Sequence, residues 1–343
     1  MSDVQPMEIS VVIPVYNAAA FLVQAVESAL AQQETAEVVL VEDGSTDASL
    51  AICQQLASDP RVKLYRHADS GHQGVSASRN LGILSSRYPF VAFLDADDYY
   101  LPERFRTARQ LFDDDPSIDG VYEAIGTHLE DEFALHRWLD QGYHEAQLTT
   151  MNAPYAPDVL FERLVGRVDG NFSIIGLVVK RELFARTGLF PPHLGVGEDA
   201  VMKWKLAAVG RLMGGQLAEP IAKSRVHGQN SYTGRAIGVS QLIRQRLATW
   251  EAFWRWAQAN LSRVQRQLFV RGSKKYLSDR LVTRNLCRKL AYSLLVRAML
   301  AYLLFKFPEL GSYSAFWKHY LPDSRKVGYR RIRQWFQKDH CLR

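Results

Sequence analysis

The stretch that decides the fold is Phe90-Val91-Ala92-Phe93-Leu94-Asp95-Ala96-Asp97-Asp98. An apolar strand is predicted to run directly into three carboxylates. Because side chains alternate along a strand, we expect Asp95 and Asp97 to share one face and Asp98 to point elsewhere. Ligands of open α/β sheets collect at the carboxyl ends of strands, and carboxylates there suit Mg²⁺ or Mn²⁺. The plainer interpretation is a polar turn in which Asp98 caps a following helix.

Working outward, short apolar runs alternate with helical patterns through the first hundred residues. Strands are predicted at Ile9–Pro14, Val38–Val41 and Arg61–Arg66, with helices at Phe21–Gln32 and Val75–Ser85. We expect the first strand to close at its proline, because proline cannot serve in a central ladder. This alternation predicts an α/β fold with a Rossmann-like, mainly parallel sheet flanked by helices.

Charge is distributed unevenly along the 343 residues, which carry a net charge of +6. Residues 1–235 hold 20 Lys and Arg against 31 Asp and Glu, whereas residues 236–343 hold 22 against 5. We therefore expect two parts, an α/β catalytic domain over 1–235 and a basic, aromatic-rich, mainly α-helical region over 236–343.

Three segments of the C-terminal region leave its role open. Gln241–Phe269 is predicted to be helical, Leu290–Phe305 is apolar but interrupted by Arg297, and Arg325–Phe336 mixes cations with aromatic side chains. Such helices can pack on the catalytic domain, lie on an anionic membrane surface, or form a homo-oligomer. We expect no nucleic-acid partner.

Neither a leader nor a membrane span is indicated by the pattern. Met1–Ser10 is polar, and no apolar run reaches 18 residues, so we expect a cytoplasmic protein, with attachment to the inner face of the membrane left open. The three cysteines lie far apart and are given no disulfide or metal role.

Five short motifs follow one another along the sequence. They are Val11-Val12-Ile13-Pro14-Val15-Tyr16-Asn17, Val41-Glu42-Asp43-Gly44-Ser45-Thr46-Asp47, Gly74-Val75-Ser76-Ala77-Ser78-Arg79-Asn80, Asp95-Ala96-Asp97-Asp98, and Gly197-Glu198-Asp199 with Arg225-Val226-His227. Together they resemble the family 2 glycosyltransferases, which are inverting, nucleotide-sugar-dependent enzymes of the GT-A fold. The usual Asp-Asp-Gly-Ser departs at its first acid, which is Glu42 here, so Asp43 is the residue carried over.

The resemblance assigns the nucleotide contacts to the first two strands and the following helix. Pro14, Val15 and Tyr16 match the floor of the nucleotide pocket, where an aromatic face holds a base. Asp43 matches the carboxylate that accepts the N3–H of uracil. Arg79 matches an arginine near the base and the diphosphate.

The resemblance also assigns the metal and the catalytic groups. Asp97 would coordinate Mn²⁺ or Mg²⁺, Asp95 would contact the ribose or a metal-bound water, and His227 would complete the site. Inversion needs a general base on the face opposite the leaving group, and Asp199 is our prediction for it. Glu198 would orient the loop or the acceptor.

The function predicted from these matches is transfer of one sugar from a nucleotide-sugar, with UDP as the expected nucleotide, to a hydroxyl of a saccharide or lipid-linked acceptor. Processive relatives carry a Gln-x-x-Arg-Trp element that is missing here, which predicts a non-processive enzyme. A nucleotidyltransferase is disfavoured because Pro14–Ala19 lacks glycine and lysine. A non-catalytic membrane or nucleic-acid binder would not need Asp97 and Asp199 together.

Overall fold

The computed structural model describes residues 7–140, 142–167, 169–228, 239–278 and 301–313. The chain divides into two compact units. Unit 1 comprises Met1–Phe161 with Asp169–Ala236, and unit 2 comprises Glu162–Val168 with Ile237–Arg343. The predicted domains, a catalytic domain over 1–235 and a helical region over 236–343, stay a prediction.

Unit 1 is built on a seven-stranded sheet with the order β3-β2-β1-β4-β8-β6-β9. Its strands are β1 (Ile9–Val15), β2 (Thr35–Glu42), β3 (Val62–Arg66), β4 (Phe90–Phe93), β6 (Gly120–Tyr122), β8 (Leu177–Lys180) and β9 (Leu212–Gly214). The first four pair in parallel, and β8 runs antiparallel to both β4 and β6. The predicted α/β class with a mainly parallel sheet is confirmed.

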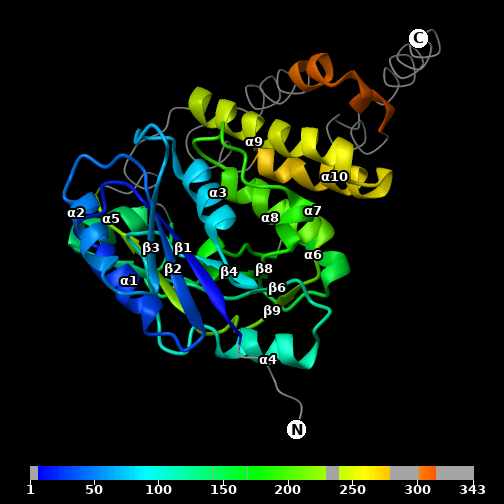
Figure 1. Ribbon diagram of the computed structural model, residues 1–343. Coiled ribbons are helices and arrows are strands. Elements are labelled where there is room, and N and C mark those ends of the chain that lie inside the picture. Colours follow the sequence, from blue (N-terminus) through cyan, green and yellow to red (C-terminus); the bar gives the residue numbers. More distant parts are fainter. Residues whose placement is uncertain (1–6, 141, 168, 229–238, 279–300, 314–343) are drawn as a thin grey trace. The chain divides into compact units, whose positions relative to one another are not determined.

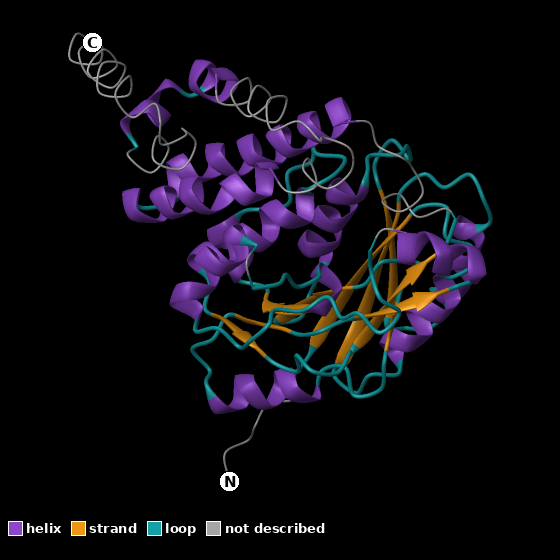
Figure 2. Cartoon of the chain, turned by 180° about the vertical axis from the view of Figure 1, so that it is seen from behind, coloured by secondary structure: helices purple, strands orange, loops and turns teal. Residues whose placement is uncertain are grey.

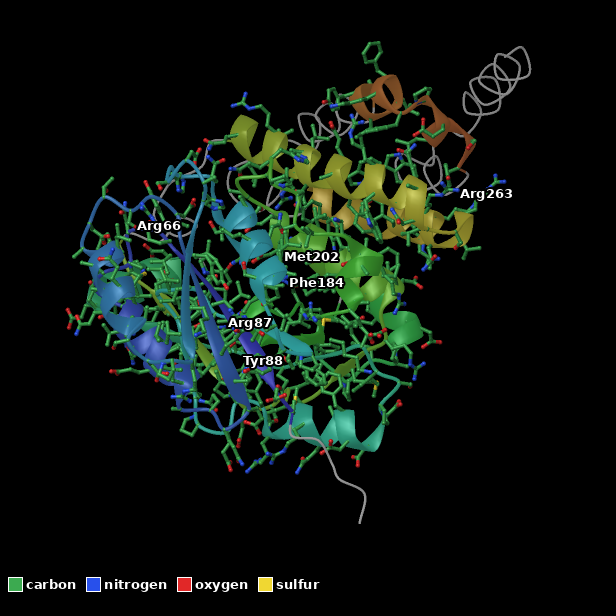
Figure 3. The ribbon with its side chains drawn as sticks, viewed as in Figure 1. Arg66, Arg87, Tyr88, Phe184, Met202 and Arg263 are labelled. Atoms are coloured by element: carbon green, nitrogen blue, oxygen red, sulfur yellow. The ribbon has the colours of Figure 1, made fainter. Side chains whose placement is uncertain are left out.

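Helices cover both faces of this sheet (Figures 1 and 2). The helices before residue 210 are α1 (Leu22–Leu30), α2 (Ser49–Leu56), α3 (Val75–Ser85), α4 (Arg106–Asp114), α5 (Glu132–Asp140), α6 (Pro157–Gly166), η1 (Ile174–Gly176), α7 (Leu183–Thr187) and α8 (Glu198–Val209). The second half of α6, from Glu162, belongs to unit 2. Leu22, Ala25, Val26 and Ala29 of α1 are buried, as expected for an apolar stripe at helical spacing. Phe184 of α7 and Met202 of α8 are both buried (Figure 3).

The strand order reverses between β1 and β4, since β2 and β3 follow on one side of β1 and β4 lies on the other. Crevices that bind ligands form at such switch points, outside the carboxyl ends of the strands. Arg66 marks the carboxyl end of β3, whereas Arg87 and Tyr88 precede β4 at the opposite end of the sheet (Figure 3). The site is therefore expected at the Arg66 end.

The prediction that Pro14 closes the first strand is wrong. β1 continues to Val15, and Pro14 pairs with Val41 of β2. The Val12 carbonyl accepts a hydrogen bond from Leu94 N–H, so Val12 and, two residues on, Pro14 direct their backbone groups toward β4. Because β4 ends at Phe93, no ladder bond is lost at the proline.

A second sheet brings a late segment of the chain to the same region. It has the order β5-β10-β7, with β5 (Tyr99–Tyr100), β10 (Ala222–Val226) and β7 (Gly126–Leu129). β10 runs antiparallel to β5 and parallel to β7. Because β5 directly follows the turn Asp95–Asp98, this pairing carries His227 to that turn.

Unit 2 contains α9 (Val239–Asn260), α10 (Arg263–Ser278) and η2 (Pro308–Ser312). The predicted single helix over Gln241–Phe269 is wrong, because it breaks at a capping box. The Ser262 hydroxyl accepts from Gln265 N–H, and the Gln265 side chain accepts from Ser262 N–H. A core of buried rings joins the helices: Trp250, Phe253, Trp254 and Phe269.

Of the apolar segment Leu290–Phe305, residues 290–300 lie outside the described residues, as does all of Arg325–Phe336. Among the described residues, every helix is too short or too polar to span a membrane.

Candidate active site

The three aspartates after β4 lie in a turn rather than in the strand. β4 ends at Phe93, and Asp98 N–H donates to the Asp95 carbonyl at 3.0 Å. Asp98 caps no helix, since α4 begins only at Arg106. Its buried carboxylate accepts from Arg225 N–H at 2.7 Å and so pins β10 to the turn. Strand alternation therefore does not apply to these three aspartates, and the turn gives each carboxylate a different partner.

Asp97 meets His227 at the end of β10. Asp97 Oδ2 lies 3.1 Å from His227 Nε2. The His227 ring packs against the ring of Phe21, with centroids 4.6 Å apart, and its side chain is only 11% exposed. The imidazole is thus held in a fixed place beside the carboxylate, although the two residues are 130 positions apart in the sequence.

Arg225 supports the Asp97–His227 pair, and the sequence motifs gave this arginine no role. Its Nε–H donates to the Asp97 carbonyl at 3.0 Å, and its guanidinium pairs with Glu130. The guanidinium also lies 4.8 Å from the centre of the Phe21 ring. Because Arg225 contacts the backbone of the turn, it fixes where the Asp97 side chain begins.

Arg79 gathers three carboxylates on one guanidinium. Its NH2 group lies 2.7 Å from Asp95 Oδ1, and its NH1 group lies 2.6 Å from Asp199 Oδ1 and 3.3 Å from Glu198 Oε1. Arg79 is 2% exposed, so these charges interact with little screening. The structure thus joins four residues that the sequence predicted separately, and it turns Arg79 toward carboxylates.

Asn80 fixes the backbone at Phe190, whose ring lies near Arg79. Sequence reasoning gave Asn80 no role. Its side-chain amide donates to the Phe190 carbonyl at 2.9 Å and accepts from Phe190 N–H at 2.8 Å. The Phe190 ring then lies 5.5 Å from the Arg79 guanidinium. From α8, Lys205 donates to the neighbouring Leu189 carbonyl at 2.9 Å. The only signal in the sequence was the place of Asn80 next to Arg79.

Glu198 and Asp199 open α8, where the helix N-terminus favours negative charge. Gly197, which caps this helix, has a φ of 93°, a conformation that favours glycine. Burial raises the pKa of Glu198 to about 7, and the charge of Asp199 adds to the rise, while Arg79 opposes it. Glu198 is thus protonated below neutral pH and charged above it.

We expect the reaction rate to rise as pH increases through about 7, because only ionised Glu198 forms the full ion pair with Arg79, the residue that holds Asp199. The replacement Glu198→Gln should abolish this step in the pH profile of kcat.

Because folding raises the pKa of Glu198, the contribution of this residue to the stability of the fold is full below the unfolded pKa near 4.5. It is lost as pH rises through about 7. Measurement of kcat from pH 5.5 to 8.5 tests the predicted rise in rate, and Glu103→Gln, at an exposed position, is the control. A rise that survives in Glu198→Gln would contradict the role of Glu198.

The predicted nucleotide residues lie at the ends of β1 and β2. Pro14 and Val15 end β1, and the Val15 carbonyl accepts from Asp43 N–H at 2.9 Å. The Tyr16 side chain follows and is 45% exposed. The Asp43 carboxylate accepts from the backbone N–H of Gln73 at 2.7 Å and of Gly74 at 2.9 Å, just before α3. Contact of these residues with a nucleotide stays a prediction.

Comparison with known proteins shows that the chain is a glycosyltransferase. Residues 10–169 match the family model described as glycosyl transferase family 2. Over these residues the chain is similar to that family. This glycosyltransferase is 29% identical over 286 residues to the succinoglycan biosynthesis protein ExoO of Rhizobium meliloti, covering 82% of this chain and 78% of ExoO. It is 38% identical over 211 residues to ExoU of the same organism, covering 58% of this chain and 56% of ExoU.

Solved structures show the same fold at low sequence identity. TarS of S. aureus, residues 1–349 in complex with UDP-GlcNAc, matches this glycosyltransferase with a TM-score of 0.65 at 18% identity, covering 97% of this chain and 92% of that one. The mannosyltransferase PcManGT of Pyrobaculum calidifontis, in complex with GDP-Man and Mn²⁺, matches with a TM-score of 0.51 at 16% identity, covering 96% and 84%. The predicted GT-A fold and glycosyltransferase activity are confirmed.

Proposed function

We propose that this enzyme is an inverting, metal-dependent, non-processive glycosyltransferase that passes one sugar from a nucleotide-sugar to a hydroxyl of a saccharide or lipid-linked acceptor during polysaccharide assembly. The observation that carries the proposal is the Arg79 network, which holds Asp95 beside Asp199 and Glu198. UDP is the expected nucleotide, and the TarS complex with UDP-GlcNAc supports it. The names of ExoO and ExoU support a role in polysaccharide biosynthesis.

In this mechanism Asp199 takes the proton of the acceptor hydroxyl as its oxygen attacks the anomeric carbon from the side opposite the leaving nucleotide. One oxygen of Asp199 is bound by Arg79, and its side chain remains 34% exposed, so it can accept a further hydrogen bond. Arg79 orients the carboxylate, and Glu198 shares the same guanidinium.

Asp97 and His227 fit a divalent cation. A carboxylate oxygen and an imidazole nitrogen 3.1 Å apart are donors that Mn²⁺ accepts. Within the described ranges no group of three or more His, Cys, Asp and Glu is placed to hold a metal, so this pair would supply two donors. Such sites commonly share the ion with substrate phosphates. When bound, the cation would stabilise negative charge developing on the diphosphate.

Nucleotide release from a panel of UDP-, GDP- and dTDP-sugars with Mn²⁺ or Mg²⁺ tests the proposal. We expect slow, metal-dependent release from one donor, which also names the sugar. Asp97→Ala should weaken Mn²⁺ binding by about tenfold to hundredfold, because it removes one of the two side chains that would bind the ion. Calorimetric titration of Mn²⁺ in the presence of UDP measures this.

Asp113→Ala, an exposed acid on α4, is the control and should bind Mn²⁺ as the wild type does. Release that is equally fast in chelator would contradict the metal dependence. Absence of release with every donor, together with no nucleotide binding, would contradict the donor assignment.

We also propose that the basic C-terminal region binds anionic membrane surfaces. Residues 236–343 carry 22 Lys and Arg against 5 Asp and Glu, and Phe305 is 90% exposed beside Lys306. Cations with exposed aromatic side chains favour such surfaces. We expect the full chain to sediment with vesicles that contain anionic lipid, less so in high salt. Equal sedimentation with uncharged vesicles would refute the proposal.

A further inference from the structure

The carboxylate of Asp43 is bound by two backbone N–H groups and has two imidazoles beside it. Backbone N–H groups of Gln73 and Gly74 occupy one position on each oxygen. His72 Nδ1 lies 2.9 Å from Oδ2, and His67 Nε2 lies 3.5 Å from Oδ1. A carboxylate offers about four acceptor positions. Asp43 is 2% exposed, so a nucleobase N–H reaches this carboxylate only when a neighbouring side chain moves aside.

Among these partners, His72 is the one that can leave. Its side chain is 51% exposed, against 14% for His67. The Gln73 and Gly74 N–H groups belong to the backbone that leads into α3 and are fixed with it. The backbone of the loop that carries His72 packs against Gly44. A Cβ at Gly44, whose φ is +71°, would lie 2.9 Å from the backbone of Gly71 and His72. The imidazole can therefore swing away while the loop backbone stays.

The His72 ring also covers Tyr16. The two rings stack with centroids 4.0 Å apart and an interplanar angle of 29°. Because a carbonyl oxygen only accepts hydrogen bonds, Nδ1 of His72 donates to the Asp43 carbonyl at 3.3 Å, and it lies 2.9 Å from Oδ2 of the buried carboxylate. The imidazole thus combines an aromatic stacking contact with a ring nitrogen beside that carboxylate. A base such as uracil, with a flat face and a ring N–H, requires the same two contacts.

We propose that His72 occupies the nucleobase position on Tyr16 and Asp43 in the free enzyme and is displaced when the donor binds. This inference rests on the proposed function, because it places the donor base on these two residues. His72 then lowers nucleotide affinity by competing for the position. The apparent dissociation constant equals the intrinsic one divided by the fraction of molecules in which the position is open.

The test is calorimetric titration of UDP into the wild-type enzyme and His72→Ala. We expect UDP to bind His72→Ala about threefold to tenfold more tightly, because the competing ring is gone. Uridine should also bind His72→Ala more tightly than the wild type, by a similar factor, because the competing ring occupies the position of the base and not that of the phosphates. His136→Ala, an exposed histidine on α5, is the matched control and should bind UDP as the wild type does.

A second measurement follows His72 directly. Its imidazole NMR signals, assigned by their loss in His72→Ala, should shift when UDP is added to the wild type. Tyr16→Ala separates the two hypotheses, because it should weaken UDP binding whether or not His72 competes. Unchanged or weaker binding in His72→Ala, with Tyr16→Ala still weakened, overturns the role of His72 and leaves the proposed function standing. No nucleotide binding by any of the proteins overturns both.

Discussion

Replacing Asp199 by asparagine is expected to lower kcat for sugar transfer by about 10²- to 10⁴-fold, the usual contribution of a general base. Asparagine has nearly the same shape, and its amide oxygen can still accept the hydrogen bond from Arg79 that the structure places at 2.6 Å. The variant therefore loses the proton acceptor without leaving the buried guanidinium unpaired. Binding of UDP, measured by calorimetry, should stay within about threefold of the wild type, since Asp199 is assigned to the acceptor side.

Asp158→Asn is a matched control for this experiment. Asp158 also lies in the first turn of a helix, α6, so its replacement removes a similar favourable interaction with the helix dipole. A rate for Asp199→Asn within about tenfold of the Asp158→Asn rate would contradict the assignment of Asp199 as the base.

Glu123→Ala is expected to lower the free energy of unfolding by about 3–5 kcal/mol. Glu123 and Arg104 form an ion pair at 2.6 Å in which both side chains are 0% exposed. The Arg104 guanidinium also lies 5.3 Å from the ring centre of Tyr100 and 4.8 Å from that of Phe105. Removing the carboxylate leaves a buried positive charge without its counterion, which is why the loss should be large.

Two further variants separate burial from charge. Glu103→Ala breaks a pair of equal length, 2.6 Å to Arg106, but with side chains 65% and 55% exposed, and should cost less than about 1 kcal/mol. The double variant Arg104→Met with Glu123→Leu should recover most of the loss, because no buried charge remains. Chemical denaturation followed by fluorescence compares the variants, and equal midpoints for Glu123→Ala and Glu103→Ala would refute the expectation.

The first hundred residues showed most of their architecture in the sequence. Buried parallel strands read as short apolar runs, so the strands that became β1 to β4 and the helices α1 and α3 were visible from local pattern. The placement of polar side chains at the ends of those strands followed, because parallel strands present their carboxyl ends at one edge. Pro14 was misjudged because its tolerance depends on where the neighbouring strand stops.

What the sequence could not show were contacts between distant segments. Arg79 meets Asp199 across 120 positions, and His227 meets Asp97 across 130. Strand β5 has only two residues, too short to produce a period, yet its pairing with β10 delivers His227. Arg104 and Glu123 gave no signal either, because charged residues are normally expected at the surface.

The two hydrogen bonds between Asn80 and Phe190 also set where this protein can change in length. They fix the register of the chain at Phe190, and α8 fixes it again from Glu198 onward. Between these anchors His193 is exposed, and a Cβ added at Gly195 would meet no atom within 4 Å. An insertion beside Gly195 would therefore be absorbed as a longer loop, whereas one placed just before Phe190 would shift the ring away from Arg79.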